Sequence, residues 1–326
     1  MTEGQFLAVY GARENNLKDV SLNIPKRKIT VFTGVSGSGK SSLVFDTIAA
    51  EAQRQLNETF TAFVQGFLPS YGQPDVDRIE YLNAPIIIDQ SRVTANSRSA
   101  PATYTGIMDD IRKAFAKANE VSASLFSFNS AGSCPNCNGL GVVYTDLAFM
   151  EGVTSTCEIC EGKRFKPGVL EYGLRGKTIS DVLDMTAEEA LAFFTEKKVK
   201  AVLQAMNDVG LSYLKLGQPL STVSGGEGQR LKLATELHKE GSVYVMDEPT
   251  TGLHLSDIGL LMGIIDRLVE AKNTVILIEH HLDVIRQADW LIDLGPEGGG
   301  AGGEVLFEGP PHELKTSERS ITARFI

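Results

Sequence analysis

The sequence has little cysteine and no long hydrophobic run. Its four cysteines lie between Cys134 and Cys160 in a chain of 326 residues, a usage that favours a metal site in a reducing compartment over a disulfide framework. No apolar stretch reaches the roughly 18–20 residues that a membrane-spanning helix needs. The first ten residues carry an acid and no basic segment, which is not typical of a signal peptide. These absences predict a cytoplasmic protein without a membrane partner.

The overall charge is acidic, with 31 Lys and Arg against 41 Asp and Glu and a formal net charge of −10. Such a balance argues against a nucleic-acid partner at first sight. The segment from Ser91 to Lys177 differs, because its ten basic residues outnumber its eight acidic ones. A phosphate-binding surface in this segment therefore stays open.

The stretch from Ile29 to Ser42 carries the strongest functional signal. An apolar strand pattern breaks at Gly34 into G-x-x-x-x-G-K-S, and helical spacing follows. The glycines let successive N–H groups point at an anion, and the next helix adds its positive N-terminal end. The motif predicts phosphate binding by Lys40 and a Mg²⁺ ligand at Ser41. The expected nucleotide-binding residues are Gly34, Ser36, Gly37, Ser38, Gly39, Lys40, Ser41 and Ser42.

Strands alternate with helices over much of the chain, which predicts a mostly parallel sheet covered on both faces. The alternation is interrupted between Ser91 and about Thr222 by a polar stretch, helices and the cysteines. We therefore expect an α/β P-loop core, formed by residues 1–90 and 223–326, with an inserted domain at 91–222. The insert should be mostly helical and carry a Cys₄ zinc module at 134–160. Its Thr186 and Glu189 form a predicted capping box at a helix start.

Polar side chains follow several predicted strands of the core. Asp247 and Glu248 end an apolar strand, where Asp247 could hold the Mg²⁺ bound to Ser41 and Glu248 could polarise water. Two acids after a strand are also common in solvated loops, so the pair predicts a site only together with the other motifs of the chain. Two of these are Gln90 and His280, which end or follow other apolar strands. A third is the helix start at Ser224-Gly225-Gly226, which provides a second N-terminus able to accept an anion.

The cysteines form two C-x-x-C knuckles, Cys134–Cys137 and Cys157–Cys160, each followed by x-Gly. Two knuckles can place four thiolates around Zn²⁺, and the glycines allow tight turns beneath the sulfurs. The apolar residues of the intervening hairpin, among them Val142, Val143 and Tyr144, are interpreted as packing on the zinc site rather than as a contact surface.

The order of these motifs resembles the ATP-binding cassette (ABC) ATPase family over residues 6–309. The resemblance implies that Gln90 senses the γ-phosphate and Mg²⁺ and that His280 contacts the γ-phosphate. It further implies that Ser224, Gly225 and Gly226 belong to a signature that closes over ATP held by a different cassette. Thr251 to His254 would lie in the loop that crosses between cassettes.

Longer strings narrow the resemblance to the UvrA family, the damage-recognition ATPases of bacterial nucleotide excision repair. They include Arg98-Ser-Ala-Pro-Ala-Thr-Tyr-Thr-Gly106, Cys157-Glu-Ile-Cys-Glu-Gly-Lys-Arg-Phe165 and Asp247-Glu-Pro-Thr-Thr-Gly-Leu-His254. They match the second of the family's two tandem cassettes. This resemblance implies ATP, Mg²⁺ and Zn²⁺ as cofactors and DNA as a partner. The basic candidates for DNA contact are Arg98, Arg112, Lys113, Lys163, Arg164 and Lys166.

The sequence also departs from the family pattern. A single cassette should need a homodimer or a second cassette half in trans, and it lacks the first-half domain that docks a UvrB-like partner. Ala95 stands where the family usually carries an additional Arg, Val223 replaces a usual Leu, and His281 replaces a usual Asn. A UvrA-like antibiotic self-resistance ATPase is one alternative. The ATPase subunit of a membrane transporter is another, which the long cysteine-bearing insert disfavours.

Overall fold

The computed structural model describes residues 4–65, 67, 72–89, 91, 93, 98–147, 150–237 and 239–326. The chain divides into two compact units, one of residues 1–90 and 236–326 and the other of residues 91–235. Residues 223–235 thus pack with the second unit, whereas the sequence analysis groups them with the core. Within the part of the chain that the structure describes, no helix combines the length and apolar character needed to cross a membrane.

The first unit contains a six-stranded sheet in the order β13-β12-β3-β11-β10-β5, in which only the β12–β13 pair is antiparallel. A second sheet, in the order β2-β1-β4, is antiparallel. The strands are β1 (Phe6–Ala12), β2 (Val20–Pro25), β3 (Ile29–Gly34), β4 (Arg78–Glu80), β5 (Pro85–Ile88), β10 (Val243–Asp247), β11 (Thr274–Ile278), β12 (Trp290–Gly295) and β13 (Glu304–Gly309). The predicted mostly parallel sheet is present.

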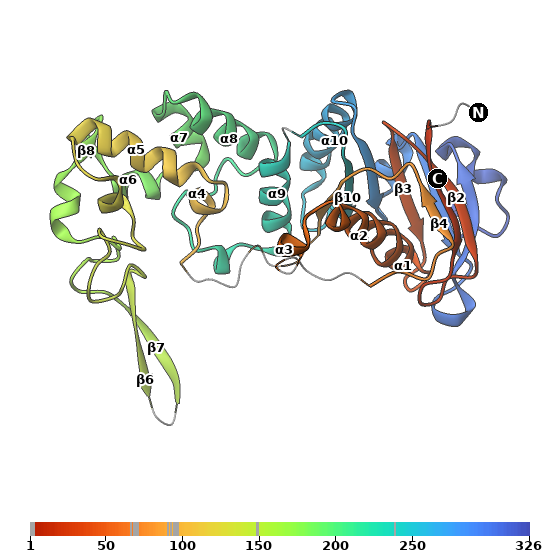
Figure 1. Cartoon of the computed structure of the whole chain (residues 1–326), viewed down its shortest axis with the longest axis horizontal. Coiled ribbons are helices and arrows are strands. Elements are labelled where there is room, and N and C mark those ends of the chain that lie inside the picture. The colour runs from red at the N-terminus through yellow and green to blue at the C-terminus, as the bar shows by residue number, and fades with distance from the viewer. Residues whose placement is uncertain are drawn as a thin grey trace. The chain divides into compact units, whose positions relative to one another are not determined.

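Helices cover this sheet on both sides (Figure 1). The helices are α1 (Lys40–Leu43), the π-helical η1 (Val44–Ala49), α2 (Ala50–Glu58), α3 (Ala62–Gln65), α10 (Leu255–Glu270) and α11 (Leu282–Gln287), with the short 3₁₀ turns η5 (Gly299–Ala301), η6 (Pro311–Thr316) and η7 (Thr322–Arg324). Alternate residues of a strand face opposite sides, so strands buried along their whole length need cover on both faces. All five residues of β11 are buried.

One face of the sheet packs against the helix that follows β3. Leu43, Val44 and Ile48 share a buried cluster with Val245 and Ile276 and with the inward residues of β1 and β2. The other face packs against α10, which contacts β11 and β3. The helix that carries Lys40 is therefore clamped between the two sheets, and its N-terminus is fixed at the carboxyl end of β3.

The second unit is mostly helical. Its helices are α4 (Pro101–Tyr104), α5 (Ile107–Asn119), α6 (Ile179–Asp184), α7 (Ala187–Phe193), α8 (Lys197–Asp208) and α9 (Gly225–Glu236), with 3₁₀ turns η2 (Ala123–Phe126), η3 (Pro167–Glu171) and η4 (Leu220–Thr222). Two small hairpins complete it, β6 (Val142–Leu147) with β7 (Met150–Thr156) and β8 (Gly173–Leu174) with β9 (Lys177–Thr178). Its core includes the buried rings of Phe115 and Phe126, whose centroids are 5.1 Å apart. The predicted capping box at Thr186 and Glu189 is formed.

Candidate functional site

The loop after β3 curls around the buried side chain of Lys40, which is 6% exposed. Its Nζ donates hydrogen bonds to the carbonyl oxygens of Gly34 at 2.9 Å and Val35 at 2.8 Å. Gly34 has a φ of 127°, and a Cβ there would lie 2.0 Å from the Leu294 carbonyl oxygen, so only glycine fits. Burial lowers the pKa of Lys40, and the nearby carboxylates of Glu248, Asp293 and Asp247 oppose that effect.

A distant glycine-rich segment supports this loop from behind. The N–H of Gly299 donates to the Gly37 carbonyl at 2.9 Å, and the N–H of Gly303 donates to the Ser38 carbonyl at 3.0 Å. Asn16 Nδ2 also donates to the Gly37 carbonyl at 2.9 Å. Because the outward carbonyls are engaged in these bonds, the loop is shaped before any ligand arrives. The motif predicts the loop but not these supports, which lie far away in sequence.

Acidic side chains gather at the carboxyl edge of the same sheet. Asp247 ends β10, and its pKa is raised by burial and by the neighbouring charges of Glu248, Asp89 and Glu279. Such mutual repulsion is relieved by a bound divalent cation. Carboxylate oxygens, together with a hydroxyl such as that of Ser41 at the start of α1, are ligands that Mg²⁺ prefers. The residues present therefore fit Mg²⁺.

Glu248 and His280 approach each other across this edge. The distance between His280 Nε2 and Glu248 Oε1 is 3.5 Å, and both side chains are a little under half exposed, at 45% and 43%. Burial and the charge of Lys40 lower the pKa of His280, which favours a neutral imidazole near pH 7. Glu248 has a φ of 41°, a left-handed conformation that is uncommon for a residue with a side chain. An outlier of this kind, beside a histidine and a phosphate-type loop, indicates a functional position.

Glu279 organises this edge, although sequence reasoning assigns it no role. Its side chain is buried, and one carboxylate oxygen accepts from the Thr250 N–H at 2.9 Å and the Thr250 hydroxyl at 2.6 Å. The other oxygen accepts from the N–H groups of His280 at 2.9 Å and His281 at 3.1 Å. Glu279 thus ties the loop after Glu248 to the loop that carries His280. The only sequence signal is its position at the end of an apolar strand.

Asp293 is a second buried acid that sequence reasoning missed. It lies on β12, is 1% exposed, and its Oδ1 accepts from the Thr322 hydroxyl at 3.3 Å. Burial raises the pKa of Asp293, while Ser320, Thr322 and Lys40 act in the opposite direction. It therefore contributes to the electrostatics around Lys40.

The signature residues lie in the second unit, at the start of α9. The Ser224 N–H donates to Glu227 Oε2 at 2.8 Å, and the Glu227 N–H donates to the Ser224 hydroxyl at 3.3 Å. This reciprocal pair is a capping box, so Ser224 is the N-cap that the sequence predicts and Gly225 begins the helix. Gln90, the remaining predicted strand-end residue, lies outside the described residues.

All four cysteines meet in one buried cluster. Their sulfur atoms lie within 4.8 Å of one another, with 3.9 Å between Cys134 and Cys157 and 3.6 Å between Cys137 and Cys160. Four sulfurs at about 2.3 Å from a tetrahedral Zn²⁺ lie about 3.8 Å apart, so the cluster fits this ion. A hydrogen bond from the Asn136 amide lowers the pKa of Cys157, which favours its thiolate, whereas burial raises the pKa of Cys160.

The hairpin between the knuckles projects from the rest of the second unit (Figure 1). Val143 packs against the cysteines, as the sequence interpretation expects. Val142 and Tyr144, by contrast, are 41% and 64% exposed. The packing interpretation is therefore right for Val143 and wrong for these two, because successive residues of a two-stranded hairpin face opposite sides and only one side meets the sulfurs.

The basic candidates of the second unit are only partly available. Arg112 pairs with Asp109, and Arg164 lies 5.3 Å from the centroid of the Phe128 ring. Lys166 Nζ donates to the Ala131 carbonyl at 2.8 Å. Lys113 and Lys163 extend further, with side chains 71% and 48% exposed, although each lies near an acid, Asp110 and Glu161 respectively.

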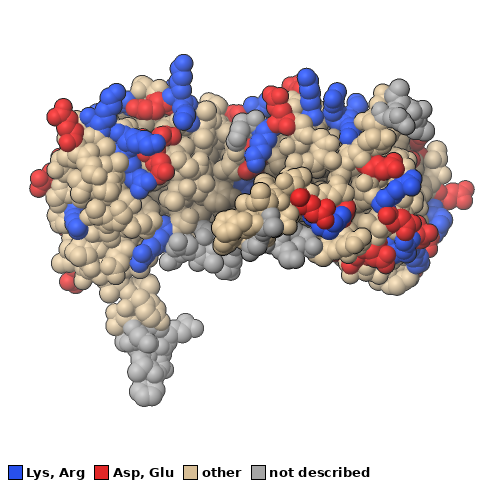
Figure 2. Space-filling model, in the orientation of Figure 1, with Lys and Arg blue, Asp and Glu red and all other residues tan. Residues whose placement is uncertain are grey.

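Arg98 also has an interaction partner within the protein. Figure 2 shows basic and acidic side chains interspersed on the visible face of the second unit. The visible face of the second unit is therefore not uniformly basic.

Comparison with known proteins agrees with this architecture. A sequence model of the ABC transporter family matches residues 158–251. UvrABC system protein A of Thermus thermophilus is 48% identical over 95% of this chain, and that of Bacillus subtilis is 44% identical over 99%. The crystal structure of UvrA2 from Deinococcus radiodurans superposes with a TM-score of 0.86 at 39% identity, covering 98% of this chain and 39% of that one.

The fold and the site define an ABC-type ATPase, a class built to bind Mg²⁺ and ATP. Its central sheet, its P-loop and its helical second unit are those of a cassette with an inserted domain. Within this class the chain is similar to UvrA proteins over nearly its whole length. It spans about a third of the length of these curated relatives, 33% and 34% respectively.

Proposed function

We propose that this chain binds and hydrolyses Mg-ATP at the carboxyl edge of its central sheet and uses the reaction in UvrA-like recognition of damaged DNA. The observation that carries the ATPase proposal is that Lys40 interacts electrostatically with Glu248 and His280, whose side chains lie 3.5 Å apart. Both come from the carboxyl ends of parallel strands, the edge at which ligands bind in open α/β sheets.

Each residue has a distinct role in this proposal. Lys40 and the loop N–H groups of Gly34, Ser36, Gly37, Ser38 and Gly39 hold phosphate oxygens, with Ser42 beside them. Ser41 and Asp247 hold Mg²⁺, which when bound neutralises charge on the phosphates. Glu248 accepts a proton from the attacking water. His280 and, by family resemblance, Gln90 contact the γ-phosphate.

ATP turnover by three variants tests these assignments. Glu248→Gln keeps the side chain's shape but loses its basicity, so turnover should fall about 10²–10⁴-fold while Mg-ATP binding changes little. Lys40→Ala removes the point charge on the phosphates and should weaken binding itself. Glu308→Gln, in the same unit but outside the site, is the matched control and should retain both. Near-normal turnover in Glu248→Gln would show that another group is the base.

The second unit is the proposed DNA-binding part. Its four cysteines hold one Zn²⁺ that fixes the hairpin-bearing module. Lys113 and Lys163 are the more exposed candidates and would contact phosphates, whereas Arg98, Arg112, Arg164 and Lys166 would first have to leave partners within the protein. So small an excess of basic residues cannot support tight binding alone, and affinity should fall steeply with salt.

Pairing of two cassettes completes the proposal. By family resemblance, Ser224, Gly225 and Gly226 of one cassette close over ATP on Lys40 of another, in a homodimer or with a second cassette half in trans. Closed two-fold symmetry is the commonest way to make such a pair. Two second units would then act together on one DNA.

Sedimentation of Glu248→Gln with and without ATP tests the pairing, and titration of damaged and undamaged duplex at two salt concentrations tests the binding. We expect an ATP-dependent dimer with salt-sensitive DNA affinity. Lys113→Gln and Lys163→Gln should weaken binding, and Lys197→Gln, on α8 of the same unit, serves as the control. A strictly monomeric protein with full ATPase activity, or affinity indifferent to salt, would contradict this part.

A further inference from the structure

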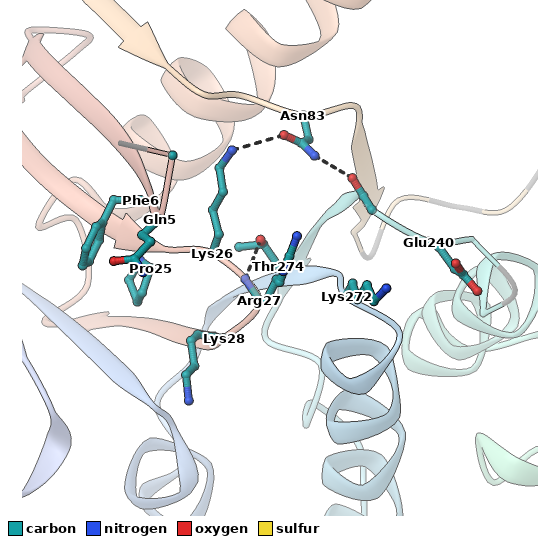
Figure 3. A pocket seen from close by; sticks show the side chains of 12 residues that line it. Gln5, Phe6, Pro25, Lys26, Arg27, Lys28, Asn83, Glu240, Lys272 and Thr274 are labelled. Carbon is teal, nitrogen blue, oxygen red and sulfur yellow. Dashed lines mark hydrogen bonds between the residues drawn. The ribbon is translucent and has the colours of Figure 1, made fainter. Parts of the chain in front are cut away.

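A second concave site lies at the opposite edge of the same sheet (Figure 3). It is a pocket of about 840 Å³ within the first unit. Lys28 immediately precedes β3, Thr274 begins β11, and Asn83 lies two residues before β5. These strands are parallel, so the pocket lies at their amino ends, whereas Lys40, Asp247 and His280 follow their carboxyl ends.

The pocket is basic in an otherwise acidic protein. Its lining includes four cationic residues, Lys26, Arg27, Lys28 and Lys272, against one acidic residue, Glu240. Lys28 is held by Asp289 at 2.9 Å. Within the described part of the chain, the side chains of Arg27 and Lys272 have no ion-pair or hydrogen-bond partner. Two cations are therefore available to a ligand in a chain whose net charge is −10.

The turns that carry these cations are fixed by the fold. Arg27 and Lys272 both have left-handed backbones, with φ of 58° and 64°. The Arg27 N–H donates to the Thr274 hydroxyl at 3.0 Å, which joins the two turns. Lys26 Nζ lies 3.5 Å from Asn83 Oδ1, and Asn83 in turn donates to the Gly241 carbonyl at 2.7 Å. Figure 3 shows this chain of contacts across the pocket.

Like charges crowded together in this way favour an anion. Burial and the charge of Arg27 lower the pKa of Lys26, so these two neighbouring cations repel each other. One wall differs, because Phe6 and Pro25 are paired residues of β1 and β2 and present an apolar surface. The pocket volume lies within the range of about 300–1,000 Å³ that is usual for small-molecule sites.

We propose that this pocket binds a small ligand bearing a di- or triphosphate group, separately from the ATP site. Arg27 and Lys272 supply the primary contacts, because a guanidinium and an ammonium can share several phosphate oxygens. The recognised group is a polyphosphate, whether it is inorganic or part of a nucleotide. A concave site with its cations around one cavity suits such a ligand better than a duplex, which needs basic groups spread along a line.

The test titrates inorganic triphosphate into the full chain by calorimetry, in a Lys40→Ala background that weakens the P-loop. A second protein adds Arg27→Asn and Lys272→Asn, which remove two charges while asparagine tolerates the left-handed backbone. A third adds Lys315→Asn, an exposed lysine outside the pocket, as the matched control. We expect binding in the first protein, at least a tenfold loss in the second, and less than a twofold change in the third.

Comparing triphosphate with ATP in the same background distinguishes the sources. If ATP binds more tightly than triphosphate, the nucleoside contacts the apolar wall formed by Phe6. If the two bind equally, inorganic polyphosphate is the ligand. No binding in the Lys40→Ala protein, or equal loss in the second and third proteins, would overturn the proposal. Loss of duplex-DNA affinity in the second protein with triphosphate binding intact would assign the pocket to nucleic acid and also overturn it. None of these outcomes depends on ATP hydrolysis, so failure here is distinguishable from failure of the ATPase proposal.

Discussion

Substitution of Glu279 by glutamine should destabilise the first unit and slow ATP turnover. The buried carboxylate accepts four hydrogen bonds, two on each oxygen, from Thr250, His280 and His281. An amide keeps one oxygen but presents an NH₂ group where the other was, so one pair of donors loses its acceptor. Hydrogen bonds to charged groups contribute about 1.5–3 kcal/mol each, which gives a loss of about 3 kcal/mol or more.

Thermal unfolding followed by circular dichroism measures this effect. For a unit of this size, about 3 kcal/mol corresponds to a fall in Tm of about 6–12 °C. Glu308→Gln is the control, because the Glu308 carboxylate accepts the Asn23 N–H at 3.0 Å and an amide oxygen can still accept it. Turnover should fall with the Tm in Glu279→Gln, since the loops carrying Glu248 and His280 lose their common tie. A Tm within about 1 °C of the control's would refute the reasoning.

Three further predictions concern other buried groups. Chelator-washed protein should retain one Zn²⁺ per chain, and less than about half an equivalent would count against the site. Cys137→Ser should unfold the cysteine module but not the first unit, which hydrogen exchange can measure. Gly139→Ala should destabilise the same module, because Gly139 has a φ of +78° and a Cβ would lie 1.8 Å from the Phe128 carbonyl oxygen. Gly168→Ala, which meets nothing within 4 Å, should be neutral, and equal melting of the two variants would contradict this. Burial raises the pKa of Asp293 above its ordinary 3.8, so its contribution to stability is present when it is protonated and is lost as the pH rises through the folded pKa. Asp293→Asn should therefore gain in urea midpoint relative to the wild type as the pH rises above about 4, and a difference that does not change with pH would contradict this prediction.

The predictable part of this fold is the part that local patterns encode. The apolar runs at Ile29 and Val243 are strands because their burial on both faces demands continuous hydrophobicity. The spacing of apolar residues predicts a helix that ends near Leu56 and another that covers 106–118. In the structure the first ends at Glu58 and the second spans Ile107–Asn119. Helix ends depend on one or two capping residues, which makes such small differences ordinary.

The unpredictable part depends on contacts between distant segments. Gly303 and Asn16 support the P-loop from opposite ends of the chain, and nothing in either local sequence indicates it. Charge counting likewise identifies Arg112 and Arg164 as basic, yet it cannot show that one pairs with Asp109 and that burial lowers the pKa of the other. A charged residue in a sequence is a candidate contact, and only its neighbours decide whether it is available.

The conformation of Glu248 shows how the same distant contacts sustain a strained site. Its N–H donates to the Ile278 carbonyl at 2.9 Å, so strand pairing continues one residue past Asp247, and the backbone then turns through a φ of 41°. A left-handed residue of this type costs about 1–3 kcal/mol. The turn it makes brings Thr250 onto the buried Glu279 carboxylate, and two charge-assisted hydrogen bonds offset that strain. The proposed base therefore holds its position through a neighbouring acid that need never touch the substrate, which is why Glu279 is as informative to mutate as Glu248 itself.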